Sequence, residues 1–138
     1  MKLGSTVDEA RAAWGGELNG APMEGTTCHY LWPKWITRPA DFAFMMEEGK
    51  FVRYDVGTDK ETAPGGGKVG MVVEQLKLLY GDALQSAPHK YVEGARYLIV
   101  KPTGAELSRF VFEVGPEGKV TRWRVGVPPA VHYVEGCS

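Results

Sequence analysis

KLGSTVDEARAAWGGELN at residues 2–19 and KVGMVVEQLKLLYGDALQ at residues 68–85 are two versions of one stretch, and they decide the fold. They align without a gap at an offset of 66 positions, since residue 2 matches residue 68. The positions identical in both are Lys2, Gly4, Val7, Gly15 and Leu18, which recur as Lys68, Gly70, Val73, Gly81 and Leu84. Self-similarity over so long a period indicates that one supersecondary unit has been duplicated.

The match continues along the rest of the chain in the same order. FAF at 42–44 matches FVF at 110–112, and GKFVRYDVG at 49–57 matches GKVTRWRVG at 118–126. The offset grows only from 66 to 69 (118 minus 49), so the insertions fall between elements, where loops tolerate them. A half of about 65 residues is marginal on its own, so we expect the two halves to join their sheets or to pack together.

Each half begins with a helix. Thr6 and Glu9 form a T-x-x-E capping box at the start of the first helix, which ends at the glycine pair beginning at Gly15. The second helix spans about 71–80 and ends at Gly81. Three strands are expected after each helix, at about 27–32, 41–46 and 50–56 in the first half and at about 95–101, 108–114 and 119–125 in the second.

The sequence therefore predicts an α+β fold of two tandem α-β-β-β units, with antiparallel sheets and the helices packed on one sheet face. The first unit covers 1–60 and the second covers 68–126. A Gly-rich linker at 61–67 joins them, and a C-terminal tail follows at 127–138. The tail is expected to belong to the same compact domain.

Strand alternation predicts which side chains face the helices. The expected helix-facing residues are Val52, Tyr54 and Val56 in the first unit and Thr121, Trp123 and Val125 in the second. The opposite face then carries Phe51, Arg53, Asp55, Val120, Arg122 and Arg124. Because antiparallel sheets often leave one face to solvent, we expect this second face to be at least partly open.

Three arginines on that face are candidate binding residues. Arg53 and Arg122 occupy equivalent positions of the repeat, and Arg124 lies two residues further on. A guanidinium offers a rigid fork of donors, so the three could form a carboxylate- or phosphate-binding patch. The alternative is that they are ordinary solvated arginines of exposed strands.

Two tryptophans in WPKW at 32–35 are the other candidates for binding. Aromatic side chains beside Lys or Arg are typical anchors of protein interfaces and can also stack on sugars. Trp35 is expected in a connecting loop, which favours a binding role. Trp32 is either a second contact residue or a continuation of the core face together with Tyr30.

Cys28 and Cys137 are the only cysteines of the chain. Termini fray unless they are tied down, so the pair predicts a disulfide that fastens the tail to the body. The alternatives are two free thiols, or a metal site with His29 and His132, although no C-x-x-C or H-x-x-x-H spacing supports one.

A disulfide predicts the periplasm or the cell exterior. No signal peptide is readable after Met1, so export would depend on a leader or longer N-terminal part outside this sequence. If Met1 is the native start, a cytosolic location follows and the disulfide loses support.

Several function classes are disfavoured by composition and motifs. Sixteen basic and seventeen acidic side chains give a net charge of −1, so the chain lacks the excess positive charge expected of a nucleic-acid-binding protein. No apolar run approaches the ~20 residues of a transmembrane segment. GGGKVG at 65–70 fits G-x-G-x-x-G, but no strand leads directly into it, so it is interpreted as linker. Without catalytic or cofactor motifs, the chain is expected to be no enzyme, to hold no metal and to bind no cofactor.

Over nearly all of residues 2–126 the order of motifs resembles the SmpA/OmlA-type outer-membrane lipoprotein module. This order is a glycine, a helix that ends in aromatic-Gly, an F-x-F strand, and a strand of the pattern G-K-h-x-R-h-x-V, where h is a hydrophobic residue. In that module a helical segment packs on a three-stranded antiparallel sheet. The tandem arrangement is similar to the β-lactamase inhibitory proteins, which duplicate such a unit and grip their target with the open sheet face. This chain differs from both because each half shows one helix rather than two and no internal disulfide. No functional residue is therefore carried over.

Together these observations predict a non-enzymatic, exported module that binds another protein of the envelope or of the secreted fraction. An inhibitor or immunity protein against a hydrolase is the specific form that the resemblance implies. The first alternative is a structural envelope lipoprotein domain. The second is a small-ligand or carbohydrate-binding protein.

Overall fold

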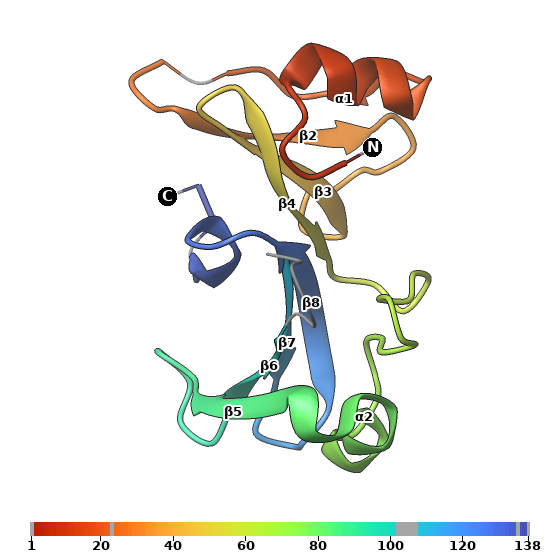
Figure 1. Cartoon of the computed structure of the whole chain (residues 1–138), viewed down its shortest axis with the longest axis vertical. Helices are drawn as coiled ribbons and strands as arrows, with labels where there is room; N and C mark the ends of the chain where they lie inside the picture. The colour runs from red at the N-terminus through yellow and green to blue at the C-terminus, as the bar shows by residue number, and fades with distance from the viewer. Residues whose placement is uncertain (1, 23, 102–107, 135, 138) are drawn as a thin grey trace.

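A single antiparallel sheet of eight strands runs through the whole molecule, in the order β1-β2-β3-β4-β8-β7-β6-β5 (Figure 1). The computed structural model describes residues 2–22, 24–101, 108–134 and 136–137. The strands are β1 (Leu18–Asn19), β2 (Cys28–Pro33), β3 (Phe42–Glu47), β4 (Lys50–Val56), β5 (Leu84–Pro88), β6 (Arg96–Val100), β7 (Arg109–Val114) and β8 (Val120–Gly126). The helical elements are α1 (Val7–Trp14), α2 (Val73–Tyr80) and the short 3-10 turns η1 (Gly81–Ala83) and η2 (Ala130–His132). The predicted α+β class is confirmed, with one antiparallel sheet and two α-helices.

The centre of the sheet is the pairing of β4 with β8. Tyr54 lies opposite Val125, and Asp55 lies opposite Arg124. These strands come from the two halves of the chain, and each would be an exposed edge without the other. Pairing them removes the two edges, which otherwise invite aggregation. The two halves therefore share one sheet.

The prediction of tandem three-stranded SmpA/OmlA-like modules is wrong. The chain builds one continuous sheet, and two further strands, β1 and β5, follow the helices at its outer edges. Pro88 closes β5, where a residue without an N–H is tolerated because the strand is an edge. Residues such as Asn19, Ser86 and Pro88 carry no strand signal of their own, so these strands are decided by their neighbours β2 and β6.

The helix ends match the predictions closely. The Thr6 hydroxyl accepts from the Glu9 N–H at 3.1 Å, and the Thr6 N–H donates to the Glu9 carboxylate at 2.9 Å. This capping box starts α1 at Val7, and Gly15 ends it with a left-handed φ of 76°. The second helix, α2, begins two residues later than predicted and ends before Gly81.

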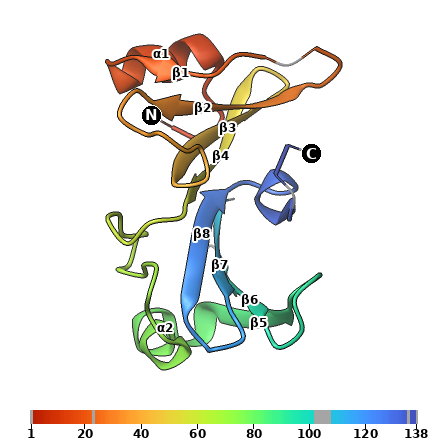
Figure 2. The same cartoon turned by 180° about the vertical axis from the view of Figure 1, so that it is seen from behind.

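Both helices pack on the same sheet face, at opposite ends of the molecule (Figures 1 and 2). The core under α1 contains Ala10, Leu18, Leu31, Phe44, Met46 and Phe51. The larger core under α2 contains Val56, Ala63, Leu76, Leu98, Val100, Phe112, Val114, Val120, Trp123 and Val125. Leu3, Phe42 and Tyr54 contact both clusters and join them.

Two β-bulges place some strand residues on the sheet face opposite to the one predicted. The register shifts between Met45 and Met46 and again between Glu113 and Val114. A bulge adds one residue to one strand, so the alternation of side chains reverses beyond it. Phe51 and Val120 consequently pack in the cores under the helices, and Val52 packs on the other face beside Cys28 and Met45. Thr121 donates to the Glu113 carbonyl at the second bulge. The predicted facing is wrong for these four residues and right for Tyr54, Val56, Trp123, Val125, the three arginines and Asp55.

The C-terminal tail covers the middle of the second sheet face, which was expected to be partly open. Ala130 packs against Cys28 and Met45, and Val131 packs against Tyr97 and Val111. The predicted disulfide is confirmed, because Cys28 and Cys137 are bonded with their Cα atoms 5.3 Å apart. The tail covers the face because it supplies both apolar side chains and, as described below, carbonyl acceptors for buried arginines.

We predict that Cys137→Ser will lower the free energy of unfolding, because the disulfide closes a loop with a sequence separation of 109. The chain-entropy model gives about 4.7 kcal/mol for a loop of about 100 residues, and disulfides typically contribute about 2–4 kcal/mol. Urea denaturation of the oxidised wild type and the variant measures the difference. The fully reduced wild type is the matched control and should unfold like the variant. Equal stability of the variant and the oxidised wild type would contradict the prediction.

Candidate functional site

Five charged side chains form a row across the tail-covered face of the sheet, which we call the ionic row: Arg53 and Asp55 of β4, Glu113 of β7, and Arg122 and Arg124 of β8. Residues two apart in a strand share a face, so each strand contributes its alternate residues to the row. The register places Asp55 opposite Arg124 and Glu113 opposite Arg122, so each cross-strand pair combines opposite charges. The structure thus brings together the three predicted arginines.

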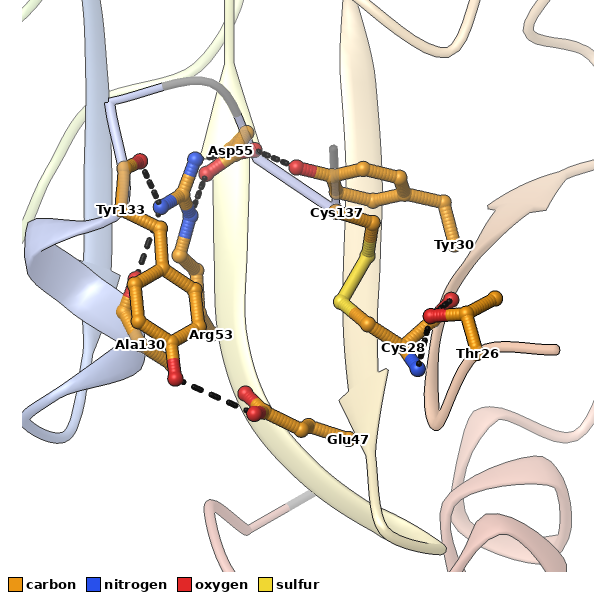
Figure 3. Close-up of a disulfide and its surroundings, with 9 residues drawn as sticks. All are labelled: Thr26, Cys28, Tyr30, Glu47, Arg53, Asp55, Ala130, Tyr133 and Cys137. Atoms are coloured by element: carbon orange, nitrogen blue, oxygen red, sulfur yellow. Dashed lines mark hydrogen bonds and ion pairs between the residues drawn. A yellow bond between two sulfur atoms is a disulfide. The ribbon is translucent and has the colours of Figure 1, made fainter.

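Arg53 and Asp55 form the buried centre of the row (Figure 3). The Arg53 Nε donates to Asp55 Oδ1 at 2.6 Å and Nη2 donates to Oδ2 at 3.0 Å, which is a bidentate pair. Arg53 Nη1 donates to the carbonyls of Ala130 at 2.8 Å and Tyr133 at 2.7 Å. Both charged residues are only 2% exposed. Since a buried charge needs a partner for each polar atom, the tail completes the shell that makes this burial tolerable.

Two tyrosines flank this centre from opposite sides in Figure 3, with Tyr30 beside the disulfide and Tyr133 on the other side of Arg53. The Tyr30 hydroxyl donates to Asp55 Oδ2 at 3.1 Å. The Tyr133 hydroxyl donates to Glu47 Oε1 at 3.1 Å and ties the tail to the end of β3. Burial raises the pKa of Tyr30 to about 12, and the Asp55 carboxylate adds to the rise. Tyr30 therefore stays protonated and serves as a donor at neutral pH.

Arg124 is held in the same way at the other end of the row. Its Nε donates to the Val131 carbonyl and its Nη1 donates to Glu113 Oε2. Its guanidinium also lies over the Tyr97 ring, 5.7 Å from the centroid. Burial lowers the pKa of Arg124, and the nearby Arg53 charge lowers it further, while Glu113 opposes the shift. Like Arg53, Arg124 is occupied by internal partners and is 3% exposed.

Arg122 is the one arginine of the row that reaches solvent, with 38% of its side chain exposed. It lies 4.0 Å from Asp55 and 4.0 Å from Glu113, both of which hold shorter bonds to other arginines. The expectation of three arginines on an open face is therefore wrong for Arg53 and Arg124. Their binding role, like that of Arg122, stays a prediction.

A second candidate site lies on the helix-bearing face. This aromatic groove has a volume of about 450 Å³ and is lined by Leu3, Ala13, Trp14, Phe42, Phe44, Phe51 and Tyr54. Trp35 stacks on Trp14 with ring centroids 5.6 Å apart and ring planes at 29°. Trp14 in turn meets Phe44 edge-on at 5.3 Å. Trp35 is 69% exposed, as a loop residue with a binding role would be.

Trp32 does not join Trp35. It is a half-buried residue of β2, on the same side of the strand as Tyr30. Its ring lies against Gly20, where an added Cβ would come within 2.9 Å of the ring and the backbone has a φ of 103°. The two tryptophans of the WPKW segment therefore belong to different environments, and the role of Trp32 in binding stays a prediction.

Trp14, Glu113 and the tail carbonyls were not predicted as parts of these sites. The helical spacing of Trp14 from Val7 and Ala10 indicates only a place on the apolar face of the first helix, and nothing in the sequence joins it to Trp35. Glu113 could have been found, because strand alternation and hairpin pairing place it beside Arg122. The carbonyls leave no sequence signal at all.

The described residues bear on the metal and membrane expectations as follows. Both cysteines are in the disulfide, and His132 lies 3.2 Å from an Arg109 nitrogen. His29 is buried in β2, and this burial lowers its pKa, as does the charge of Arg11. Across residues 2–22, 24–101, 108–134 and 136–137, no group of three or more His, Cys, Asp or Glu side chains is placed to hold a metal ion. In the same ranges no helix has the length and apolar character needed to cross a membrane.

We predict that Asp55→Asn will destabilise the protein by about 3–5 kcal/mol, because it leaves the Arg53 charge buried without its anionic partner. Glu17→Gln is the matched control, since Glu17 forms an exposed ion pair with Lys34 at 3.5 Å. Such pairs contribute about 0–1 kcal/mol. Urea denaturation at neutral pH measures both changes. A similar small loss in both variants would show that the buried pair contributes nothing special.

We predict that stability will fall between pH 10 and about pH 12, in part because of Tyr30. Its folded pKa of about 12 exceeds the value of 10 expected in the unfolded chain. Over this window the unfolded state loses the tyrosine proton and the folded state keeps it, so unfolding is favoured by up to about 2–3 kcal/mol. Tyr30→Phe should be less stable at neutral pH but should show a shallower alkaline decline. Parallel pH profiles of the free energy of unfolding would refute the assignment.

Comparison with known proteins gives one similar solved structure. The sequence matches no protein-family model and, at a significant level, no curated protein. The fold is similar to that of an extracellular protein containing an SCP domain from Bacillus anthracis str. Ames, solved at 1.5 Å resolution. The TM-score is 0.55 at 13% sequence identity, and the match covers 91% of this chain and 44% of that one.

This likeness concerns the fold alone. The match covers less than half of the similar protein, and the two sequences are only 13% identical. Together with the single eight-stranded sheet, the finding overturns the predicted SmpA/OmlA-like resemblance.

Proposed function

We propose that this chain is a non-enzymatic protein-binding module that acts in the periplasm or outside the cell, and that the aromatic groove is its binding surface. The observation that carries the proposal is Trp35, which is 69% exposed while stacked on Trp14 at the groove. Exposed tryptophans beside apolar grooves are the typical energetic centres of protein interfaces.

The groove is built to receive a partner without rearrangement. Trp35 lies within a turn that is closed by the Ile36 N–H donating to the Pro33 carbonyl at 3.0 Å. Trp14 is held by the capped helix α1 and by its edge-on contact with Phe44. Because both indoles are already oriented, binding would lose little side-chain entropy.

The rim of the groove adds polar groups around the apolar centre. Lys34 precedes Trp35 and forms the exposed ion pair with Glu17, which follows α1 closely in the chain. An apolar centre with a charged rim is the usual arrangement of a reversible protein interface. The occupant that fits best is a protein segment that places an apolar or aromatic side chain in the groove beside Trp14, over the aromatic residues of the sheet.

The proposed location is supported by two observations. Disulfides persist in oxidising compartments, and Cys28 and Cys137 are bonded here. The similar solved structure is that of an extracellular protein. An inhibitor or immunity protein against a hydrolase is one form that such a module can take, and identification of the bound protein tests it.

A small carbohydrate is the second candidate for the groove, because an exposed tryptophan ring is also a stacking platform for sugars. The preference for a protein rests on the extent of the aromatic lining, which runs from Trp14 to Tyr54 and is larger than the single platform that one sugar needs. Trp35 adds to this surface through its stack on Trp14. No contact of the described residues favours a structural envelope lipoprotein domain.

We predict that Trp35→Ala will abolish capture of the partner from secreted and envelope proteins of the producing cell. Loss of a central tryptophan should weaken binding of the purified partner by about 2 kcal/mol or more, roughly thirtyfold. Leu78→Ala is the matched control, since Leu78 is 88% exposed on α2, far from the groove. Isothermal titration calorimetry with the purified partner measures both affinities.

Two outcomes would contradict the proposal. Equal partner affinity of the Trp35 and Leu78 variants would remove the groove from the interface. A change in Trp35 fluorescence on addition of simple sugars, with no protein captured, would favour the carbohydrate alternative.

A further inference from the structure

We infer that the sheet face opposite the aromatic groove holds a second site, a pocket in which Arg122 binds a small monoanionic carboxylate. The pocket has a volume of about 310 Å³. Its polar side is formed by Tyr30, Arg53, Asp55 and Arg122, and its apolar side by Pro39, Ala40 and Val134. The inference does not depend on the proposed protein-binding function, because the two sites lie on different faces of the sheet.

The charge balance of the ionic row assigns an anion to this pocket. Within the ionic row three arginines face two carboxylates, so one positive charge is left over. His89 Nε2 also lies 3.5 Å from Glu113 Oε1 and adds positive charge when it is protonated. Asp55 is bound in a bidentate manner by Arg53, and Glu113 is bound by Arg124. The surplus charge therefore belongs to Arg122.

The contacts of Arg122 leave its donors available. Both of its ion pairs are at 4.0 Å, which is too long for a hydrogen bond. Within the described part of the chain its side chain makes no hydrogen bond, although a guanidinium carries five N–H donors. Because 62% of the side chain is buried (100% minus the 38% exposed), bonds to a ligand would be less weakened by water than at a fully exposed arginine.

The pocket favours a carboxylate over a phosphate. A single surplus charge matches a monoanion. The two carboxylates 4.0 Å from Arg122 would repel a phosphate dianion more strongly than a monoanionic carboxylate. The planar fork of a guanidinium fits the two oxygens of a carboxylate. Ligand pockets usually measure about 300–1,000 Å³, so a volume of 310 Å³ suits a short aliphatic body.

The tail is part of the site. Val134 and Gly136 line the pocket, and the disulfide at Cys137 follows directly. Gly136 approaches the Tyr30 hydroxyl so closely that a Cβ would lie 2.4 Å from it. The pocket wall therefore depends on a tail seated against β2, and we expect reduction of the disulfide to weaken binding.

An NMR titration of the isotope-labelled, oxidised protein tests the inference. Sodium isobutyrate is the probe, and sodium chloride at equal ionic strength and isobutyramide are the ligand controls. We expect saturable shifts of the Arg122 side chain and of Asp55 and Val134 with isobutyrate only. Sodium phosphate is titrated to compare a phosphate with a carboxylate. An acetylated dipeptide with a free C-terminus is titrated to compare a peptide end with the free acid isobutyrate. The carboxylate that binds more tightly shows which of these two is the natural source.

Variants separate the role of Arg122 from general charge effects. Arg122→Gln should weaken isobutyrate binding about tenfold or more, since it removes a charge-assisted hydrogen bond. Arg122→Lys should keep part of the affinity, because it retains the charge and loses the fork. Arg96→Gln, an exposed arginine of β6, should bind like the wild type. Unchanged dispersion of the spectra shows that each variant is folded.

Four results would overturn the inference: no saturable shift with either carboxylate, the same shifts with chloride (an adventitious ion only), tighter binding of phosphate than of carboxylate, or unchanged affinity of Arg122→Gln. Loss of partner capture by Trp35→Ala has no bearing on any of them, so the two proposals fail separately.

Discussion

Burial of Arg53 and Arg124 under the C-terminal tail is the constraint on which the rest of the structure depends. A guanidinium removed from water must have acceptors in every direction, and the strands alone supply only Asp55 and Glu113. The carbonyls of Ala130, Val131 and Tyr133 supply the others. The tail is therefore part of the charged centre of the sheet and not only a covering of its surface.

This constraint explains the position of the disulfide. Carbonyl acceptors work only if the segment that carries them stays in place, and a terminal segment frays unless it is anchored. Cys137 bonds to Cys28 beyond the last of these carbonyls, and the Tyr133 hydroxyl bonds to Glu47 on the way. The anchor thus lies at the far end of the segment that it has to hold (Figure 3).

The two faces of the sheet have different consequences for binding. On the helix-bearing face the two helices lie at opposite ends of the molecule (Figure 2). Aromatic residues line the groove beside α1. On the other face the tail fills the centre and leaves Arg122 at its margin, where a pocket remains. A fold shared at 13% identity with an SCP-domain-containing extracellular protein says nothing about either surface, because function depends on sites rather than on scaffolds.

The sequence by itself determined the features that depend on neighbouring residues or on a pattern along the chain. The capping pair Thr6 and Glu9 predicted the start of α1, and the two F-x-F segments predicted β3 and β7. The position of Cys137 near the end of the chain predicted the disulfide. Each of these is a local interaction or a constraint on a terminus, so it can be recognised without knowing the fold.

Only the tertiary structure decided the features that arise between distant segments. The bulges at Met45–Met46 and Glu113–Val114 are shifts in register between paired strands, and they reversed the facing of Phe51 and Val120. The stacking of Trp14 on Trp35 and the carbonyl bonds to Arg53 join residues that no short-range pattern connects. Whether an arginine on a strand is solvated or buried depends on what covers the strand, and here the tail left only Arg122 of the three in contact with water.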